Sequence, residues 1–199
     1  IALLTNSYFP RRSITNEEFL DVKSKWLIKH KNLDLIENYL ITNENLENKS
    51  ELVKYYIDYY LSKSEITKAC EIFKKTNILN NDNYVSKFKI YCLINENKND
   101  EAQLNYDLIK EIGFQDKFFE KQLNYLMGYE EKTDNEVSEN SLLDFHLSHR
   151  TNPDFQFEPK VTTSELIWKY LSSSNLLEDA GNINIENVEK IFAIEKATN

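Results

Sequence analysis

Apolar residues recur every three or four positions along most of this chain, the spacing that gathers side chains on one face of an α-helix. The pattern therefore predicts an all-α fold, with short polar segments between successive helices. The predicted helices span residues 17–29, 33–42, 51–61, 65–76, 84–94, 99–112, 116–127, 141–149, 164–171 and 185–196.

Residues suited to helix ends stand at several of these boundaries. Thr15 or Asn16 stands before the first helix, and Ser50 and Ser64 precede two others; their side-chain oxygens could accept hydrogen bonds from the first free backbone N–H groups. Gly113 and Gly128 follow helices, where glycine adopts the left-handed conformation without a steric penalty. These residues predict where individual helices begin and end.

The chain also matches itself at a shift of 33 residues. Two apolar columns of this alignment are Leu27, Tyr60, Leu93 and Leu126, and then Trp26, Tyr59, Cys92 and Tyr125. The first and the second helix of each unit repeat with the same period. We therefore predict tandem helical hairpins, since a fixed period of this length marks repeat architectures.

The second helix of two units carries a small residue followed four positions later by an aromatic one, and that of the first unit has two aliphatic residues at the same spacing. The pairs are Ala69 with Phe73, Ala102 with Tyr106 and, in weaker form, Ile36 with Leu40. Over residues 17–128 this resembles the tetratricopeptide repeat family, although Ile57 and Ile90 stand where that family has a small residue. The resemblance implies a right-handed α-solenoid of about four tetratricopeptide-like hairpins with C-terminal capping helices.

A second resemblance is to an uncharacterised family of alphaproteobacterial helical-repeat proteins, some of which carry secretory signals. Residues 91–128 and then 141–147 carry it, with Ala102, Leu108, Gly113 and Phe118–Phe119. It implies a periplasmic rather than a cytoplasmic location.

The repeat register fails after Met127, because the next second-helix columns would fall on the polar residues Asn135 and Glu139. We expect a lead segment over residues 1–15, repeats over 16–128 and an acidic linker over 129–140. Residues 141–199 would hold a displaced repeat helix that completes the fourth hairpin, followed by capping helices. The acidic segment could instead serve as a docking tail.

Composition excludes some classes of function. The net charge is −9, whereas proteins that bind nucleic acid cluster Lys and Arg to neutralise phosphates. Glycine and proline number three each, too few for the many tight turns of a sheet-rich fold. No apolar run approaches the ~20 residues that a transmembrane helix requires. We expect neither a nucleic-acid partner nor a transmembrane segment.

The two cysteines, Cys70 and Cys92, have no metal-binding spacing and fall within apolar helical stretches. We expect small buried thiols there, and a disulfide between them remains open.

Few residues suggest catalysis or metal binding. His146 and His149 lie three apart on a predicted helix, with Asp144 close by, but zinc needs three or four ligands and no further one is specified. Glycine-rich phosphate loops and a G-x-S-x-G nucleophile motif are absent from the sequence. We therefore predict no cofactor, no catalytic residue and no metal, with His146 and His149 as weak candidates for a metal site.

Aromatic residues are the better binding candidates, because tyrosine offers a large contact area and a hydroxyl group. Four tyrosines lie in the predicted helix over residues 51–61, and they cannot easily all face the same neighbour. The candidate surface residues are Trp26, Tyr55, Tyr59 and Tyr125, with Lys25 and Lys89 beside them. Aromatic residues at helical spacing are more often core, so burial of all of them is the competing interpretation.

We accordingly expect a non-catalytic scaffold that binds a protein or peptide. One alternative is an enzyme that uses a metal or a small molecule near His146 and His149. Another is a structural subunit of a larger assembly.

Overall fold

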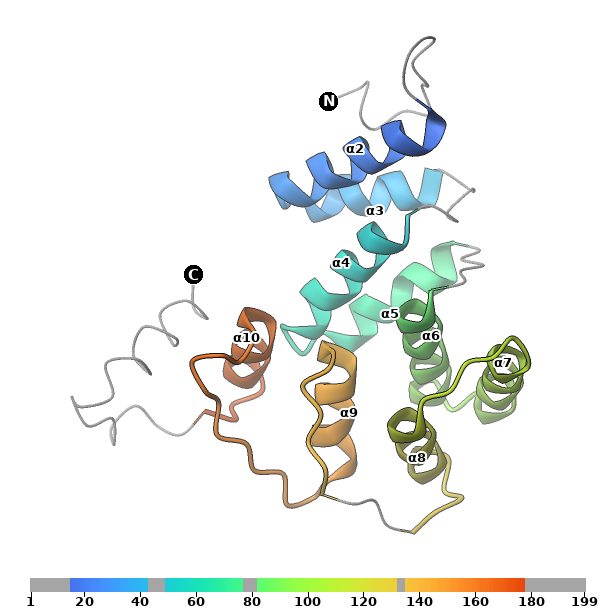
Figure 1. The fold of residues 1–199 in the computed structure, drawn as a ribbon, viewed down its shortest axis with the longest axis vertical. Coiled ribbons are helices and arrows are strands. Elements are labelled where there is room, and N and C mark those ends of the chain that lie inside the picture. Colours follow the sequence, from blue (N-terminus) through green and yellow to red (C-terminus); the bar gives the residue numbers. More distant parts are fainter. Residues whose placement is uncertain (1–14, 43–48, 77–81, 132–134, 178–199) are drawn as a thin grey trace, which may run out of the picture.

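The computed structural model describes residues 15–42, 49–76, 82–131 and 135–177, and these residues form helices and connecting segments without any β-strand (Figure 1). This confirms the predicted all-α class. The helices are α2 (Asn16–His30), α3 (Leu33–Thr42), α4 (Ser50–Leu61), α5 (Ile66–Lys75), α6 (Asn83–Asn95), α7 (Asn99–Glu111), α8 (Lys117–Leu126), α9 (Leu142–Thr151) and α10 (Glu165–Ser173). The predictions for residues 1–14 and for a helix over 185–196 lie outside the described residues.

The ends of α2 and two glycine positions follow the sequence-based expectation. Thr15 caps α2, since its hydroxyl accepts from the Glu18 N–H at 3.2 Å while the Glu18 carboxylate accepts from the Thr15 N–H at 2.8 Å. Gly113 and Gly128 have φ angles of 97° and 79°, in the region that favours glycine.

The expected caps at Ser50 and Ser64 are wrong. Ser50 is the first residue of α4 itself, and Lys49 occupies the cap position. Ser64 lies one residue before the cap of α5 with a φ of 58°, and its hydroxyl bonds the hydroxyls of Ser173 and Ser174 instead. A distant segment thus uses the oxygen that a local cap would have required.

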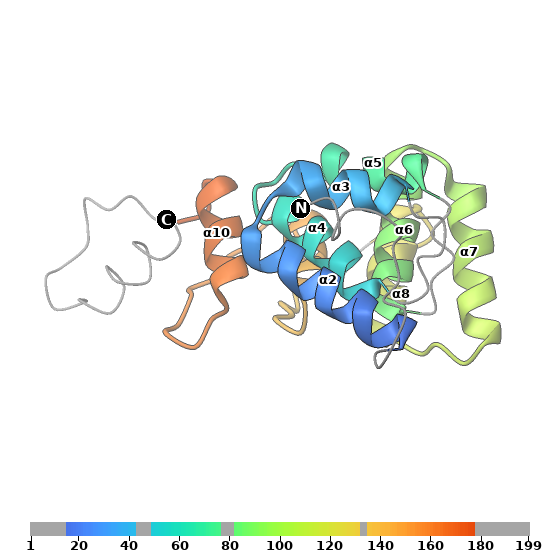
Figure 2. The same cartoon turned by 90° about the horizontal axis from the view of Figure 1, so that it is seen from above.

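Successive helices pack as hairpins in chain order, α2 with α3, α4 with α5, and α6 with α7. The first helices also contact one another in sequence, α2 with α4, α4 with α6 and α6 with α8, and α3 contacts α5. The same helices lie side by side in Figures 1 and 2. These contacts bury one apolar face of the outer helices, such as α7, whereas α6 is buried on several sides.

The last described helix, α10, departs from its expected position at the end of the stack. Helix α9 packs against α8 but also against α4, and α10 packs against α4 and α9. Helix α10 therefore covers the side of the second hairpin, whereas we expected it to cap the end of the stack (Figure 1). Residues 142–148 of α9 are all buried, as is typical of a helix surrounded by other elements.

The two cysteines form a disulfide, so the expectation of two buried thiols is wrong. The bond joins Cys70 in α5 to Cys92 in α6 and closes a segment with a sequence separation of 22. It links the second helix of one hairpin to the first helix of the next. None of the helices in the described part of the chain has the length and apolar content needed to cross a membrane.

Reduction of the Cys70–Cys92 disulfide should lower the free energy of unfolding by about 3 kcal/mol, because the bond restricts the unfolded chain. Urea unfolding with and without a reductant measures this difference. The Cys70→Ser/Cys92→Ser double variant should match the reduced wild type and should not respond to the reductant. Two thiols titrating in the unfolded, unreduced protein would contradict the assignment.

Candidate functional site

Helix α9 brings several polar side chains into the centre of the molecule. The Ser141 hydroxyl caps it by accepting from the Asp144 N–H, and Asp144, His146, Ser148 and Thr151 are all buried within it. A buried polar group costs free energy unless it has a hydrogen-bonding partner. The partners of these side chains therefore indicate whether they stabilise the fold or are available to bind a ligand.

The ammonium group of Lys87 joins three helices through two carboxylates. Its Nζ lies 2.8 Å from Asp144 in α9 and 2.8 Å from Asp116, the cap residue of α8. Burial raises the pKa of Asp116, but the hydrogen bond and the charge of Lys87, together with the backbone N–H groups of Phe119 and Phe118, outweigh it and hold that pKa below its ordinary value. Lys87 is 6% exposed, so water screens this charge cluster only weakly.

A second buried carboxylate lies on α4. The Tyr84 hydroxyl donates a short hydrogen bond to Asp58, and this contact joins α6 to α4. Burial raises the pKa of Asp58 to about 6, against the hydrogen bond from Tyr84 and the charge of Lys54, which both lower it.

His146 sits between two tyrosines and uses both ring nitrogens. Its Nε2 lies 2.7 Å from the Tyr91 hydroxyl and its Nδ1 lies 2.8 Å from the Tyr170 hydroxyl, which also bonds His149. Burial lowers the pKa of His146 to about 3, with smaller contributions from the charges of His149 and Arg150. The imidazole is therefore neutral at ordinary pH, with one nitrogen donating and the other accepting.

These contacts bear on the weak metal candidates His146 and His149. Both nitrogens of His146 are bonded to tyrosines, and the carboxylate of Asp144 is bonded to Lys87. The described residues contain no group of three or more His, Cys, Asp or Glu side chains placed to hold a metal ion. The network therefore uses its polar groups to hold α6, α9 and α10 together.

Two buried lysines lie near the N-terminal end of the described chain. Lys49 is 2% exposed and its Nζ lies 4.8 Å from the ring centroid of Tyr39, which Lys23 also approaches. Burial and the charge of Lys23 lower the pKa of Lys49 to about 8. An amine with such a pKa is more nucleophilic near neutral pH, but its burial separates it from solutes.

An open pocket of about 540 Å³ lies where the turn between α4 and α5 meets the ends of α6 and α9. Its lining includes Ser64, Lys68, Asn95 and Arg150, and the Lys68 ammonium forms a 2.6 Å ion pair with Glu65. Because the lining carries both signs of charge beside apolar carbon, its chemistry favours no single class of ligand.

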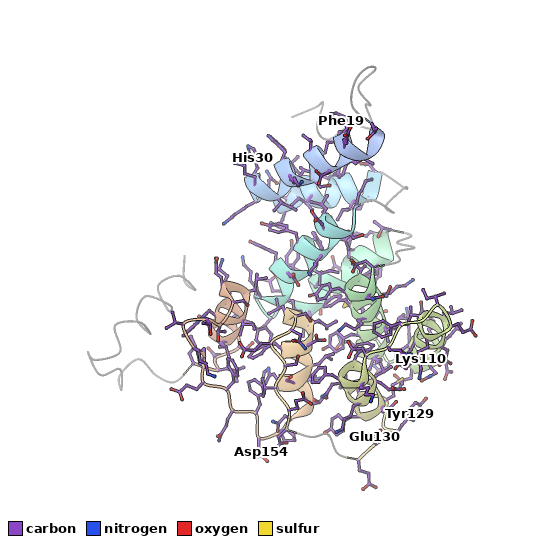
Figure 3. All side chains as sticks on the ribbon, in the orientation of Figure 1. Phe19, His30, Lys110, Tyr129, Glu130 and Asp154 are labelled. Carbon is purple, nitrogen blue, oxygen red and sulfur yellow. A yellow bond between two sulfur atoms is a disulfide. The ribbon has the colours of Figure 1, made fainter. Side chains whose placement is uncertain are left out.

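The predicted surface residues on α2 and α4 are neither fully buried nor fully exposed, apart from Lys25. Trp26 is half-buried and stacks on His30 with ring centroids 3.9 Å apart, at the end of α2 labelled in Figure 3. Tyr55 and Tyr59 are half-buried on α4, whereas the neighbouring Tyr56 is 2% exposed. Lys25 is exposed and pairs with Asp21 on its own helix.

The remaining predicted surface residues are Tyr125 on α8 and Lys89 on α6, and both are half-buried. The repeat column that holds Trp26, Tyr59 and Tyr125 is interrupted in the third hairpin by Cys92, which is buried in the disulfide. The structure thus keeps Tyr55 and Tyr59 adjacent but does not extend them into an unbroken aromatic row.

The outer face of α7, which we did not single out from the sequence, carries the clearest exposed apolar surface. Leu104, Leu108 and Ile112 follow one another at intervals of four and are 60%, 52% and 74% exposed. Ala102 and Tyr106 on the opposite face are buried against the rest of the molecule. The sequence signal was available, because these three apolar residues lie outside the inner face that the Ala102–Tyr106 pair marks.

Comparison with family models, with curated proteins and with solved structures found no match to this chain.

Replacement of two tyrosines of α4 should destabilise the protein to different extents, because one side chain is more deeply buried than the other. Tyr56→Ala removes a side chain that is 2% exposed and should cost about 3–5 kcal/mol of unfolding free energy. Tyr59→Ala removes a half-buried ring and should cost about 1 kcal/mol. Urea unfolding measures both, and equal losses would show that Tyr59 belongs to the core.

The histidine network predicts a dependence of stability on pH. The pKa of His146 is lowered from 6.5 in the unfolded chain to about 3 in the folded protein, so acid favours the unfolded state between these values. We expect the wild type to lose stability relative to His146→Gln as pH falls from 6.5 towards 4, by up to about 1.4 kcal/mol per pH unit.

The comparison with the His146→Gln variant separates the contribution of His146 to the pH dependence of stability from that of Asp58. The raised pKa of Asp58 acts in the opposite direction, because the folded state then binds the proton first and gains stability as pH falls below 6. Asp58 is present in both proteins, and its contribution cancels in the difference. His30→Gln, at the exposed end of α2, controls for loss of an imidazole, and parallel wild-type and His146→Gln profiles would contradict the assignment.

Proposed function

We propose that this protein is a non-catalytic scaffold that binds another protein, with the outer face of α7 as its main contact surface. The observation that carries this proposal is the exposure of Leu104, Leu108 and Ile112 on one helix face. We call these three residues the α7 stripe.

The α7 stripe is unusual for a surface because large aliphatic side chains gain free energy when they leave water. Isolated exposed leucines are common on proteins, whereas several aligned on one exposed helix face are typical of interaction sites. Each of the three is more than half exposed, so a partner would bury a large apolar area. Figures 1 and 2 both place α7 at the outer edge of the molecule, where a partner can approach it.

The order of helix contacts supports a repeat scaffold of the tetratricopeptide-like kind. Each first helix contacts the next first helix, from α2 to α8, as expected for a right-handed solenoid of stacked hairpins. In such an array the half-buried Trp26, Tyr55 and Tyr59 would form a second, smaller contact area on the first two hairpins.

The state of the reactive side chains supports a role without catalysis. The His146 nitrogens, the Asp144 carboxylate and the Lys87 ammonium are all bonded to one another or to tyrosines inside the protein. A general acid or base must reach its substrate within hydrogen-bonding distance, and a fully buried network gives no such access.

The disulfide supports a location in an oxidising compartment. Structural disulfides persist in secreted and periplasmic proteins and are rare in a reducing cytosol. The Cys70–Cys92 bond therefore agrees with the periplasmic location that the family resemblance implies.

Replacement of the α7 stripe should abolish partner capture without affecting the fold. We expect Leu104→Ser/Leu108→Ser/Ile112→Ser to change the free energy of unfolding by no more than about 0.5 kcal/mol per site, because the side chains are exposed. The wild type on a resin should retain a protein from an extract of the source cells, and the triple variant should lose it.

The matched control is Val22→Ser, which removes an apolar side chain that is 52% exposed on α2. It should retain the same protein as the wild type. Capture that survives in the triple variant would show that the α7 stripe is not the contact surface.

A further inference from the structure

We propose that the α7 stripe binds an amphipathic helix of a partner protein, and that this helix carries basic residues beside its apolar face. This inference rests on the proposed function and adds the chemistry of the partner.

The geometry of the stripe favours a helical partner over an extended one. Leu104 and Leu108 form a ridge along α7, which runs from Asn99 to Glu111, and Ile112 continues this ridge at the C-cap position. A ridge of this kind fits the groove between side-chain rows of a second helix. An extended strand would need free backbone N–H and C=O groups, and those within α7 already bond one another.

The charges around the stripe favour a basic partner. Asp100, Glu101, Asp107 and Glu111 are all exposed on the same side of α7, between and beside the apolar residues. The nearest lysine on this helix, Lys110, is labelled in Figure 3 and is paired with Glu120 at 2.7 Å. Lysine or arginine beside the apolar residues of a partner would therefore meet carboxylates.

Helix formation alone does not account for these acids. Asp100 and Glu101 lie in the first turn, where they complement the helix dipole, but Glu111 is the last residue of α7 and opposes it. A carboxylate at that position weakens the isolated helix, whereas a cation from a partner would offset its cost.

Two other occupants fit the surface less well. A second copy of this chain carries a net charge of −9 and would place acidic α7 against acidic α7. The described chain ends at Leu177, just after α10, which packs against α4 and α9 on the opposite side of the molecule from α7 (Figure 1). The end of the described chain, next to α10, thus lies away from the α7 stripe.

Three synthetic peptides of about 20 residues, long enough to form a helix, test the proposal. The first has leucines on one face and lysines beside them, and the second replaces those lysines with glutamates. The third has the composition of the first in an order without an apolar face. Fluorescence anisotropy of the labelled peptides gives the Kd for the full chain.

We expect the wild type to bind the basic amphipathic peptide about tenfold or more tightly than either other peptide. The stripe triple variant should lose most of this affinity, and Val22→Ser should keep it. Asp107→Lys/Glu111→Lys should reverse the preference towards the glutamate peptide. Thermal unfolding of each variant confirms that the loss arises at the surface.

Equal binding of the lysine and glutamate peptides would overturn the charge assignment. The proposal also fails if the third peptide binds as tightly as the first, or if the triple variant binds the first peptide as tightly as the wild type does. Either result would show only a general attraction between opposite charges. A dimer in sedimentation that the triple variant abolishes would identify a second copy as the occupant. If the stripe is needed for capture from cells but the basic peptide does not bind, this inference fails while the proposed function stands.

Discussion

The two carboxylates that share the ammonium group of Lys87 hold the core of this protein together. Helix α9 is buried along residues 142–148 although it contains Asp144, His146 and Ser148, and each of these groups costs free energy inside the protein unless it is bonded. Lys87 meets Asp144, while Tyr91 and Tyr170 meet His146. These bonds satisfy the polar groups of α9 in its central position. They also join α9 to α6 and α10, and Lys87 links α8 to the same cluster through Asp116.

The same constraint shapes what the protein can do. The His146 nitrogens and the Asp144 carboxylate are bonded inside the protein, and burial lowers the pKa of His146 to about 3, so its imidazole stays neutral near neutral pH. The apolar surface that we propose for binding lies at the periphery, where α7 is held through its Ala102–Tyr106 face and leaves Leu104, Leu108 and Ile112 exposed.

Local sequence signals predicted the helices well because the interactions that start, extend and end a helix lie within a few residues. The predicted range 33–42 coincides with α3, and Thr15 caps α2 through the residue three positions later. The expectations failed where a distant segment intervened. Ser64 bonds Ser173 and Ser174 across the fold, and the two expected thiols of Cys70 and Cys92 meet in a disulfide. The spacing of residues along the chain does not predict which hydroxyl Ser64 will bond or which thiol Cys70 will meet.

The sequence by itself determined the helical class, the order of the hairpins and the absence of a phosphate loop or nucleophile motif, since each is a matter of periodicity or of a contiguous motif. It also marked the inner face of α7 through Ala102 and Tyr106. Only the tertiary structure decided that α9 enters the centre, that His146 bonds two tyrosines and that the α7 stripe stays uncovered. The physical reason is that burial depends on which helices meet, and those contacts join residues far apart in the chain.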